Sequence, residues 1–240
     1  MKIEIIPQSK QYETLLDLFP PQPANKFLPQ WYKEIGRGEQ VDSNLGYGSA
    51  ITAKRCPAIQ DLVSTGFILP IWGDLSLKTF YKEDGEIDRQ AWNITTAKAY
   101  GEDADDWIGW HSEEQTKGMD IGRTIAGQTL KLKCPYKFIV PKGYDLLYTD
   151  PFYHFRKDIR CFMGLVEADK WGIITFPFEI LNAESFIMKA GTPLVHVIPI
   201  KRDSFEYQLR NGTEEEYEHT NKMLREFFLT QETYKYRDYS

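Results

Sequence analysis

The chain has 240 residues, of which 42% are hydrophobic and 14% aromatic, and its formal net charge is -6 at pH 7. So large an apolar share excludes a disordered chain, and the aromatic content favours β-strands, because flat side chains fit a pleated surface. The excess of acidic residues argues against a general nucleic-acid-binding or anionic-membrane surface, and it leaves room only for a local basic pocket.

The cysteines and the N-terminus both bear on localisation. Cys56, Cys134 and Cys161 are widely spaced and form no Cys-x-x-Cys pair, which is typical of buried free thiols in a reducing compartment. The first seven residues alternate like a strand rather than like a signal peptide. No apolar run approaches the roughly 20 residues of a membrane helix. We therefore expect a cytoplasmic protein without a membrane partner.

The N-terminal region is predicted to contain short helices. A proline-rich stretch at 19–23 indicates a turn or a polyproline connection. Two amphipathic helices are expected after it, at 28–35 and 57–65. Each has a proline at its start and a glycine at its end, as helix boundaries commonly do.

Three strands are expected next, at 67–72, 75–81 and 87–94. The last two are separated by an Asp-Gly step, which is a strong signal for a hairpin turn. Residues 97–126 are polar and contain several glycines. We predict a long loop there, with one helical turn.

The second half has the rhythm of a β barrel or sandwich, with short strand-like runs bounded by Gly, Pro or Asn. The predicted strands are 129–134, 136–140, 145–148, 160–167, 173–180, 185–188 and 193–201. A helix follows, in which Thr213 and Glu216 form a capping box. Its apolar face comprises Tyr217, Met223, Leu224, Phe227 and Phe228.

These patterns predict a mainly β protein, either a barrel or a sandwich, that is α+β overall because of its short N-terminal helices and its C-terminal helix. We expect one β-rich domain at 1–212. The C-terminal helix and an aromatic tail would then occupy 213–240.

Two motifs in the second half resemble a known family when they are taken together. Pro141-Lys142-Gly143-Tyr144 closes a strand, and Gly164-Leu165-Val166-Glu167-Ala168-Asp169-Lys170-Trp171-Gly172 precedes Lys189-Ala190-Gly191 and an apolar strand. This order resembles the core of the dUTPase-like β-clip family, with its Pro-x-Gly-Tyr turn, its hairpin and its Lys-x-Gly turn. The resemblance covers about 129–200 and leaves 1–128 as an N-terminal extension. By analogy it implies a β-clip barrel and a trimer.

The motifs with which dUTPases act are replaced in this chain. By position, Glu167 matches the aspartate that orients water in that family, but Lys170 stands in place of its tyrosine. The phosphate-binding turn falls at Thr149-Asp150-Pro151-Phe152. Here Asp150 would repel a phosphate, and Pro151 has no N–H to donate. The resemblance thus implies a retained fold and lost dUTP hydrolysis.

At the scale of the whole chain, the sequence is similar to a family of uncharacterised proteins from tailed phages, notably T4-like and cyanobacterial ones, and from some bacteria. The similarity is carried by residues 26–33, 54–57 and 191–202. It implies a phage-encoded protein that acts in the cytoplasm of the infected host cell or, alternatively, in the virion.

Candidate ligand-binding residues gather around the β-clip landmarks. They are Glu167, Asp169, Arg156, Arg160 and His154. With Lys157, the basic residues among them would bind a phosphate or a carboxylate, and the alternative is an exposed basic loop without a ligand. No residue is predicted to be catalytic.

A metal centre would need converging histidines and carboxylates. The candidates are His154, His196 and Glu167, in a two-histidine, one-carboxylate arrangement. No short His-x-His pair supports such a centre, so histidines satisfied within the fold are favoured. We predict neither a metal nor another cofactor.

Three functions stay open at this stage. The first is an accessory protein whose β-clip-like core binds a small anionic ligand, or a host or phage protein, without hydrolysing dUTP. The second is a structural or decoration protein of the virion. The third is an enzyme, either a diverged nucleotide hydrolase or a metal-dependent oxygenase.

Overall fold

We describe the protein from a computed structural model that covers residues 2–39, 50–85, 87–93, 107–119, 129–182 and 184–229. The chain divides into two units. The first consists of Met1–Ile35 and Asp61–Arg202, and the second of Gly36–Gln60 and Asp203–Ser240. Each unit is described by itself.

The first part of the chain contains short helices and strands. They are β1 (Glu4–Pro7), η1 (Lys10–Tyr12), α1 (Glu13–Leu18), β2 (Gln22–Pro23), η2 (Ala24–Phe27), α2 (Gln30–Glu34), α3 (Pro57–Ser64), β5 (Phe67–Pro70), β6 (Leu75–Tyr81), β7 (Ile87–Asn93), β8 (Ile108–His111) and η6 (Glu113–Thr116). The helices predicted behind Pro29 and at Pro57 are confirmed. The hairpin of β6 and β7 is confirmed as well.

The second half of the first unit is built from strands. They are β9 (Thr129–Ile139), β10 (Tyr144–Thr149), β11 (Ile159–Cys161), β12 (Gly164–Val166), β13 (Ile173–Ile180), β14 (Phe186–Met188) and β15 (Pro193–Lys201). The predicted bounds of β13 and β15 agree with the structure, because both strands lie between clear turn residues.

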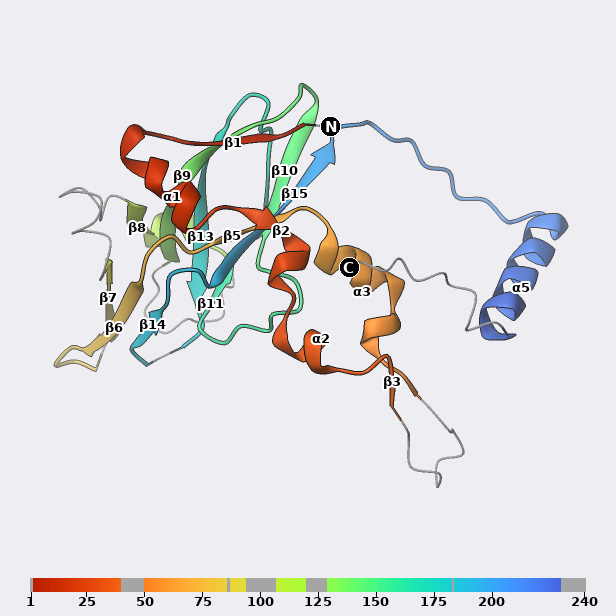
Figure 1. The fold of residues 1–240 in the computed structure, drawn as a ribbon, viewed down its shortest axis with the longest axis horizontal. Helices are drawn as coiled ribbons and strands as arrows, with labels where there is room; N and C mark the ends of the chain where they lie inside the picture. The colour runs from red at the N-terminus through yellow and green to blue at the C-terminus, as the bar shows by residue number, and fades with distance from the viewer. Residues whose placement is uncertain are drawn as a thin grey trace. The chain divides into compact units, whose positions relative to one another are not determined.

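Two five-stranded antiparallel sheets form the body of this unit (Figure 1). The first sheet has the order β1-β9-β13-β11, with β8 also paired to β9, and the second sheet has the order β12-β10-β15-β5-β2. A smaller sheet has the order β14-β6-β7. The prediction of a mainly β fold with short N-terminal helices and a C-terminal helix is confirmed, but the sheets of the described residues do not close into a barrel.

The core lies between the two large sheets. The Phe67 and Phe138 rings are 5.8 Å apart, and the Tyr148 and Phe176 rings 5.3 Å, so each pair joins one sheet to the other. Inward-facing residues of both sheets, such as Leu132 on β9, are fully buried. Aromatic pairs at these spacings add to the free energy gained by burying apolar surface.

Two predictions about strands were wrong in ways that have a physical explanation. Residues 97–126 were predicted as a loop with one helical turn; η6 is such a turn, but Ile108–His111 pairs with β9 as β8. Residues 94–106 and 120–128 lie outside the described part. The two strands predicted on either side of Pro135 are one strand, β9. Pro135 lies where the register between β9 and β13 shifts, and at such a bulge its missing N–H breaks no ladder.

The strand predicted at 160–167 is also divided. It breaks at 162–163 into β11, which pairs with β13 in the first sheet, and β12, which pairs with β10 in the second. The turn around Glu167 therefore connects the two sheets, because β12 and β13 do not belong to the same sheet. The predicted β-hairpin at this place is replaced by a crossing between sheets.

The second unit contains β3 (Gly38–Glu39), β4 (Ala50–Ile51), η4 (Ala53–Arg55) and the long helix α5 (Glu214–Leu229). The predicted capping box is confirmed, since the Thr213 N–H donates to the Glu216 carboxylate at 2.7 Å and the Glu216 N–H donates to the Thr213 hydroxyl at 3.3 Å. The aromatic tail at 234–239 lies outside the described residues. Among the helices that the structure describes, none is long and apolar enough to cross a membrane.

Candidate functional site

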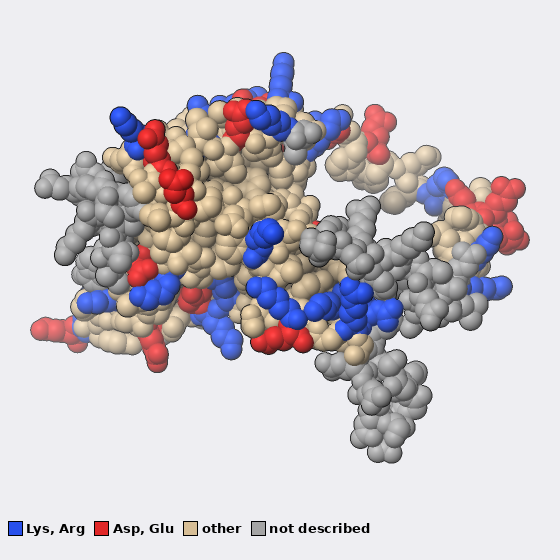
Figure 2. Space-filling model, in the orientation of Figure 1, with Lys and Arg blue, Asp and Glu red and all other residues tan. Residues whose placement is uncertain are grey.

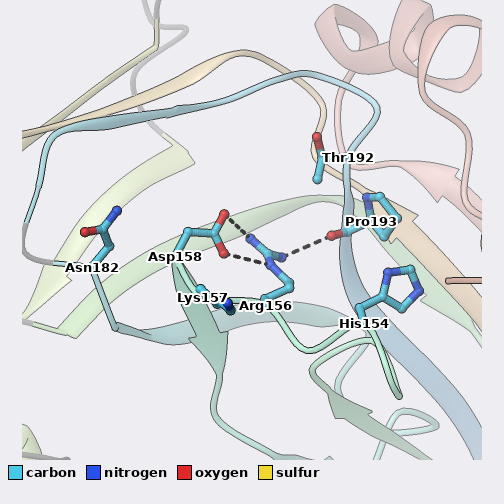
Figure 3. A pocket seen from close by; sticks show the side chains of 7 residues that line it. All are labelled: His154, Arg156, Lys157, Asp158, Asn182, Thr192 and Pro193. Carbon is cyan, nitrogen blue, oxygen red and sulfur yellow. Dashed lines mark hydrogen bonds and ion pairs between the residues drawn. The ribbon is translucent and has the colours of Figure 1, made fainter. Parts of the chain in front are cut away.

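A pocket of about 320 Å³ opens in the first unit where three separate segments meet (Figure 3). The segments are the loop before β11, the residues just after β13 and the turn before β15. The lining residues are His154, Arg156, Lys157, Asp158, Asn182, Thr192 and Pro193. Charged groups of both signs and neutral polar groups thus surround one small volume.

The Arg156 side chain is held in place in the wall of the pocket. It is only 8% exposed. Its Nε and Nη2 donate to the two Asp158 carboxylate oxygens at 3.1 and 3.2 Å. Nη1 donates to the Pro193 carbonyl at 3.0 Å, and Nη2 also contacts the Met188 sulfur at 3.4 Å. A guanidinium has five N–H donors, so these four contacts leave one N–H on Nη1.

Lys157 supplies an exposed positive charge at the pocket. Its side chain is exposed and makes no ion pair with any residue in the described part of the chain. Asp158 balances Arg156, so Lys157 leaves the pocket with one net positive charge while His154 is neutral. On the face drawn in Figure 2, basic side chains gather in the lower centre with a few acidic ones beside them, and charged side chains of both signs are scattered over the rest.

His154 lies at the side of the pocket in a constrained loop. Burial lowers the pKa of its ring below the ordinary value, with further lowering from Arg156, although a hydrogen bond with the Phe27 backbone opposes the shift. The ring is therefore uncharged at neutral pH. Its neighbours Tyr153 and Phe155 have φ values of 61° and 48°, which is unusual outside glycine and marks a backbone held under strain.

Trp31 holds this loop in place. Its indole Nε1 donates to the Tyr153 carbonyl at 2.7 Å, and its ring lies 6.3 Å from the Tyr153 ring and 6.0 Å from the Phe155 ring. A strained backbone persists only where its surroundings over-determine it. The α2 helix thus positions His154 from outside the pocket.

The other predicted ligand-binding residues lie away from this pocket. Arg160 on β11 pairs with Glu179, the residue opposite it on β13. Glu167 forms an exposed ion pair with Lys170 within its own turn. Of the predicted candidates, His154 and Arg156 therefore meet, whereas Arg160 and Glu167 do not join them.

Asp169 belongs to an ion network at the end of the second sheet. Arg202 Nη2 donates to its carboxylate at 2.8 Å, and the Gly143 N–H donates to the same group at 2.8 Å. Arg202 also pairs with Asp145 on β10. The two motifs that resemble the β-clip family in sequence are thus linked, because Asp169 from the second motif binds the backbone of Gly143 in the first.

This network predicts a stability that falls in acid. The hydrogen bonds from Arg202 and Gly143 lower the pKa of Asp169 from 3.8 to about 2. A lowered carboxyl pKa stabilises the folded state above the unfolded value of about 4, and this contribution is lost as the pH falls through about 2. In urea denaturation, the difference in unfolding free energy between wild type and Asp169→Asn should be present at pH 5 and close progressively below pH 4. A difference that stays constant over this range would contradict the assignment.

The turn at 149–152, which would hold phosphate in a dUTPase, is occupied by its own side chains. The Cys161 N–H donates to the Asp150 carboxylate at 3.0 Å, and burial raises the pKa of that carboxyl. The Phe152 ring packs at 4.9 Å from the ring of His196. Burial also raises the pKa of the Cys161 thiol, and it raises that of Cys134 to about 12, so neither is a reactive thiolate.

The histidines proposed for a metal centre have other surroundings. His196 on β15 is 1% exposed, and its Nε2 lies 2.6 Å from the Thr65 carbonyl oxygen. Glu167 is engaged with Lys170. Within the described ranges, no group of three or more His, Cys, Asp or Glu side chains is arranged to hold a metal ion.

Sequence reasoning identified the basic residues of the pocket but did not predict its other walls. Asp158 is adjacent to the basic cluster and was overlooked, although a carboxylate two residues from an arginine is a simple signal. Asn182 reaches the pocket because β11 pairs with β13, so that Ile159 stands opposite Ile180. Thr192 precedes β15 and Pro193 begins it, and because β15 belongs to the other sheet, only the packing of the two sheets brings them near.

No protein-family model matches this sequence, and no curated protein matches it either. The two resemblances seen in the sequence therefore stay predictions.

Proposed function

We propose that the protein is an accessory protein that binds a small anionic ligand, bearing a carboxylate or a phosphate, in the pocket around Arg156 and Lys157. The observation that carries the proposal is the exposed ammonium group of Lys157 beside a guanidinium fixed by Asp158 and Pro193. Both cations bind anions through charge-assisted hydrogen bonds, and a guanidinium that is already fixed loses little freedom on binding.

The size and lining of the pocket narrow the class of ligand. Its volume of about 320 Å³ is at the small end for ligand pockets, which start near 300 Å³. Apart from His154, no lining residue has an aromatic ring on which a nucleobase would stack. The Thr192 hydroxyl donates to the Lys189 carbonyl at 2.6 Å and so offers acceptor lone pairs to the ligand. A small organic acid or phosphate compound with a hydroxyl or amine suits this lining better than a nucleotide.

The proposal excludes dUTP hydrolysis, and two features support that exclusion. Glu167, the counterpart of the catalytic aspartate, is held by Lys170 outside the pocket. The 149–152 turn presents a carboxylate and a proline where phosphate would need donors. A phage-encoded role in the cytoplasm of an infected host rests on the sequence similarity. A place in the virion and an oxygenase activity gain no support from the described residues.

The test is to measure anion binding with and without Lys157. Isothermal titration against inorganic phosphate, a three-carbon phosphate ester and a hydroxydicarboxylate should reveal binding by at least one of them. Lys157→Ala should weaken that binding about 10- to 100-fold, since one charge-assisted hydrogen bond contributes about 1.5–3 kcal/mol. Lys133→Ala, which removes an exposed lysine from β9, is the matched control and should bind like wild type. Equal affinity of the two variants, or no binding by any anion, would overturn the proposal.

A further inference from the structure

We propose that residues 204–210, termed the arm, add a strand to the open edge of the second sheet in another copy of this chain. The arm carries apolar side chains at every second position. Phe205, Tyr207 and Leu209 are 85%, 81% and 89% exposed, and the residues between them are polar. This alternation is typical of a strand with one buried face, yet the described residues offer the arm no strand partner within its own chain.

The receiving edge is β12. It is the outermost strand of the second sheet and pairs only with β10 among the described strands. The backbone groups on its outer side therefore remain available, and such an edge is a template for another strand. Leu165, at the centre of β12, is 59% exposed.

The side chains beside this edge are apolar. Leu165 stands opposite Leu147 on β10, which in turn stands opposite Ile198 on β15, so the three form a row across neighbouring strands. Met163, two residues before Leu165, is 67% exposed. A strand added beyond β12 would extend the row by one residue on the same face. Tyr207 would thus meet Leu165, and one of its two apolar neighbours in the arm would meet Met163, instead of water.

The length of the chain favours a second copy over the same chain. The Arg202 N–H donates to the Gly143 carbonyl, so Arg202 is level with Gly143, four residues along β10 from Leu147. A strand beyond β12 lies three strand spacings from β15, about 14 Å, and the four residues add about 13 Å along the sheet. The straight distance from Arg202 to the position that Tyr207 would occupy beside Leu165 is therefore about 20 Å. The five residues from Arg202 to Tyr207 span at most about 18 Å. In the register that centres Tyr207 on Leu165, the arm cannot reach its own β12.

The area buried by reciprocal exchange suits a stable assembly. A buried Phe or Tyr removes about 150–250 Å² from water, so the four aromatic side chains of two arms remove about 600–1,000 Å². The surfaces that they cover lose a similar area. The sum, about 1,200–2,000 Å², is that of a standard specific interface.

Light scattering after size-exclusion chromatography of the full chain tests the inference. Wild type should elute at a multiple of its 28.0 kDa mass. The variant F205S/Y207S/L209S should elute as a single chain, and so should L165D. The matched control E206S/Q208S, which changes the opposite side of the arm, should keep the mass of wild type. Circular dichroism of each variant verifies that it is folded.

Mixing the two monomeric variants provides the sharpest readout. L165D still has a functional arm, and the triple variant still has a functional edge, so an equimolar mixture should form a complex with twice the mass of one chain. A monomeric wild type, an oligomer that survives the triple variant, or L165D with the wild-type mass would each overturn the inference. Anion binding by the triple variant should be unchanged, which separates this inference from the proposed function.

Discussion

Replacing Arg156 by methionine should lower the free energy of unfolding by about 3 kcal/mol. The guanidinium is nearly inaccessible and makes contacts with Asp158, Pro193 and Met188. Removing one partner of a buried ion pair costs about 3–5 kcal/mol, because the other charge loses its compensation. We expect the lower end of this range because the Asp158 side chain remains 33% exposed to water. Methionine keeps the length of the side chain, so the loss reports hydrogen bonds and charge rather than a cavity.

Urea denaturation of matched variants checks this value. Lys170→Met breaks the ion pair between Lys170 and Glu167, two side chains that are 67% and 51% exposed. It should lower the free energy of unfolding by less than about 1 kcal/mol. Adding Asp158→Asn to Arg156→Met should recover part of the loss, since no unpaired carboxylate then remains. If Arg156→Met lowered the unfolding free energy no more than Lys170→Met, Arg156 would not be held in the pocket by a stabilising buried ion pair.

Where local chemistry decides the structure, the sequence was a sufficient guide. The capping box of α5 depends only on Thr213 and Glu216, three residues apart, and both of its hydrogen bonds form. The bounds of β13 and β15 were predictable because turn residues lie at both ends of each strand. These features need no knowledge of what lies across the sheet.

Where distant strands decide the structure, the sequence was not enough. The run from Arg160 to Glu167 is uniformly strand-like, and only the packing of two sheets divides it into β11 and β12. Pro135 predicts a break, but the bulge opposite it keeps β9 continuous. Whether a strand crosses from one sheet to another depends on register, and register depends on partners that no local pattern reveals.

The contrast between neighbouring and distant residues also explains which parts of the candidate site could be predicted. The sequence placed His154, Arg156 and Lys157 together because they are neighbours in the chain, and all three line the pocket. It did not separate the roles of the two cations, one buried and paired and the other exposed. Asp169 was considered for ligand binding, but Arg202, 33 residues further on, engages its carboxylate. Partners this distant follow from strand order, which was not predicted.

Gly66→Ala should be among the most damaging single substitutions in the first unit. Gly66 has a φ of +68°, and a Cβ there would lie 2.3 Å from the Val197 carbonyl oxygen. The left-handed backbone costs an alanine about 1–2 kcal/mol and overpacking about 1–3 kcal/mol, so we expect a total of about 2–5 kcal/mol. Val197 cannot move aside easily, because β15 is held by β10 on one side and β5 on the other.

Gly85→Ala is the matched control, since Gly85 has a φ of +84° but nothing within 4 Å of its Cβ position. Gly85→Ala should cost only the backbone strain of about 1–2 kcal/mol. The difference in unfolding free energy between the two variants, measured by urea denaturation, therefore isolates the contact with β15. His196 gives a second readout. Burial lowers the pKa of the His196 ring, and the ring donates a hydrogen bond to the carbonyl of Thr65, the residue before Gly66. If Gly66→Ala pushes the segment of Thr65 and Gly66 away from β15 and exposes the imidazole to water, the His196 pKa measured by NMR should rise toward its ordinary value. If Gly66→Ala and Gly85→Ala lowered the unfolding free energy equally, and the His196 titration were unchanged, the contact of position 66 with Val197 would tolerate a Cβ, contrary to the prediction.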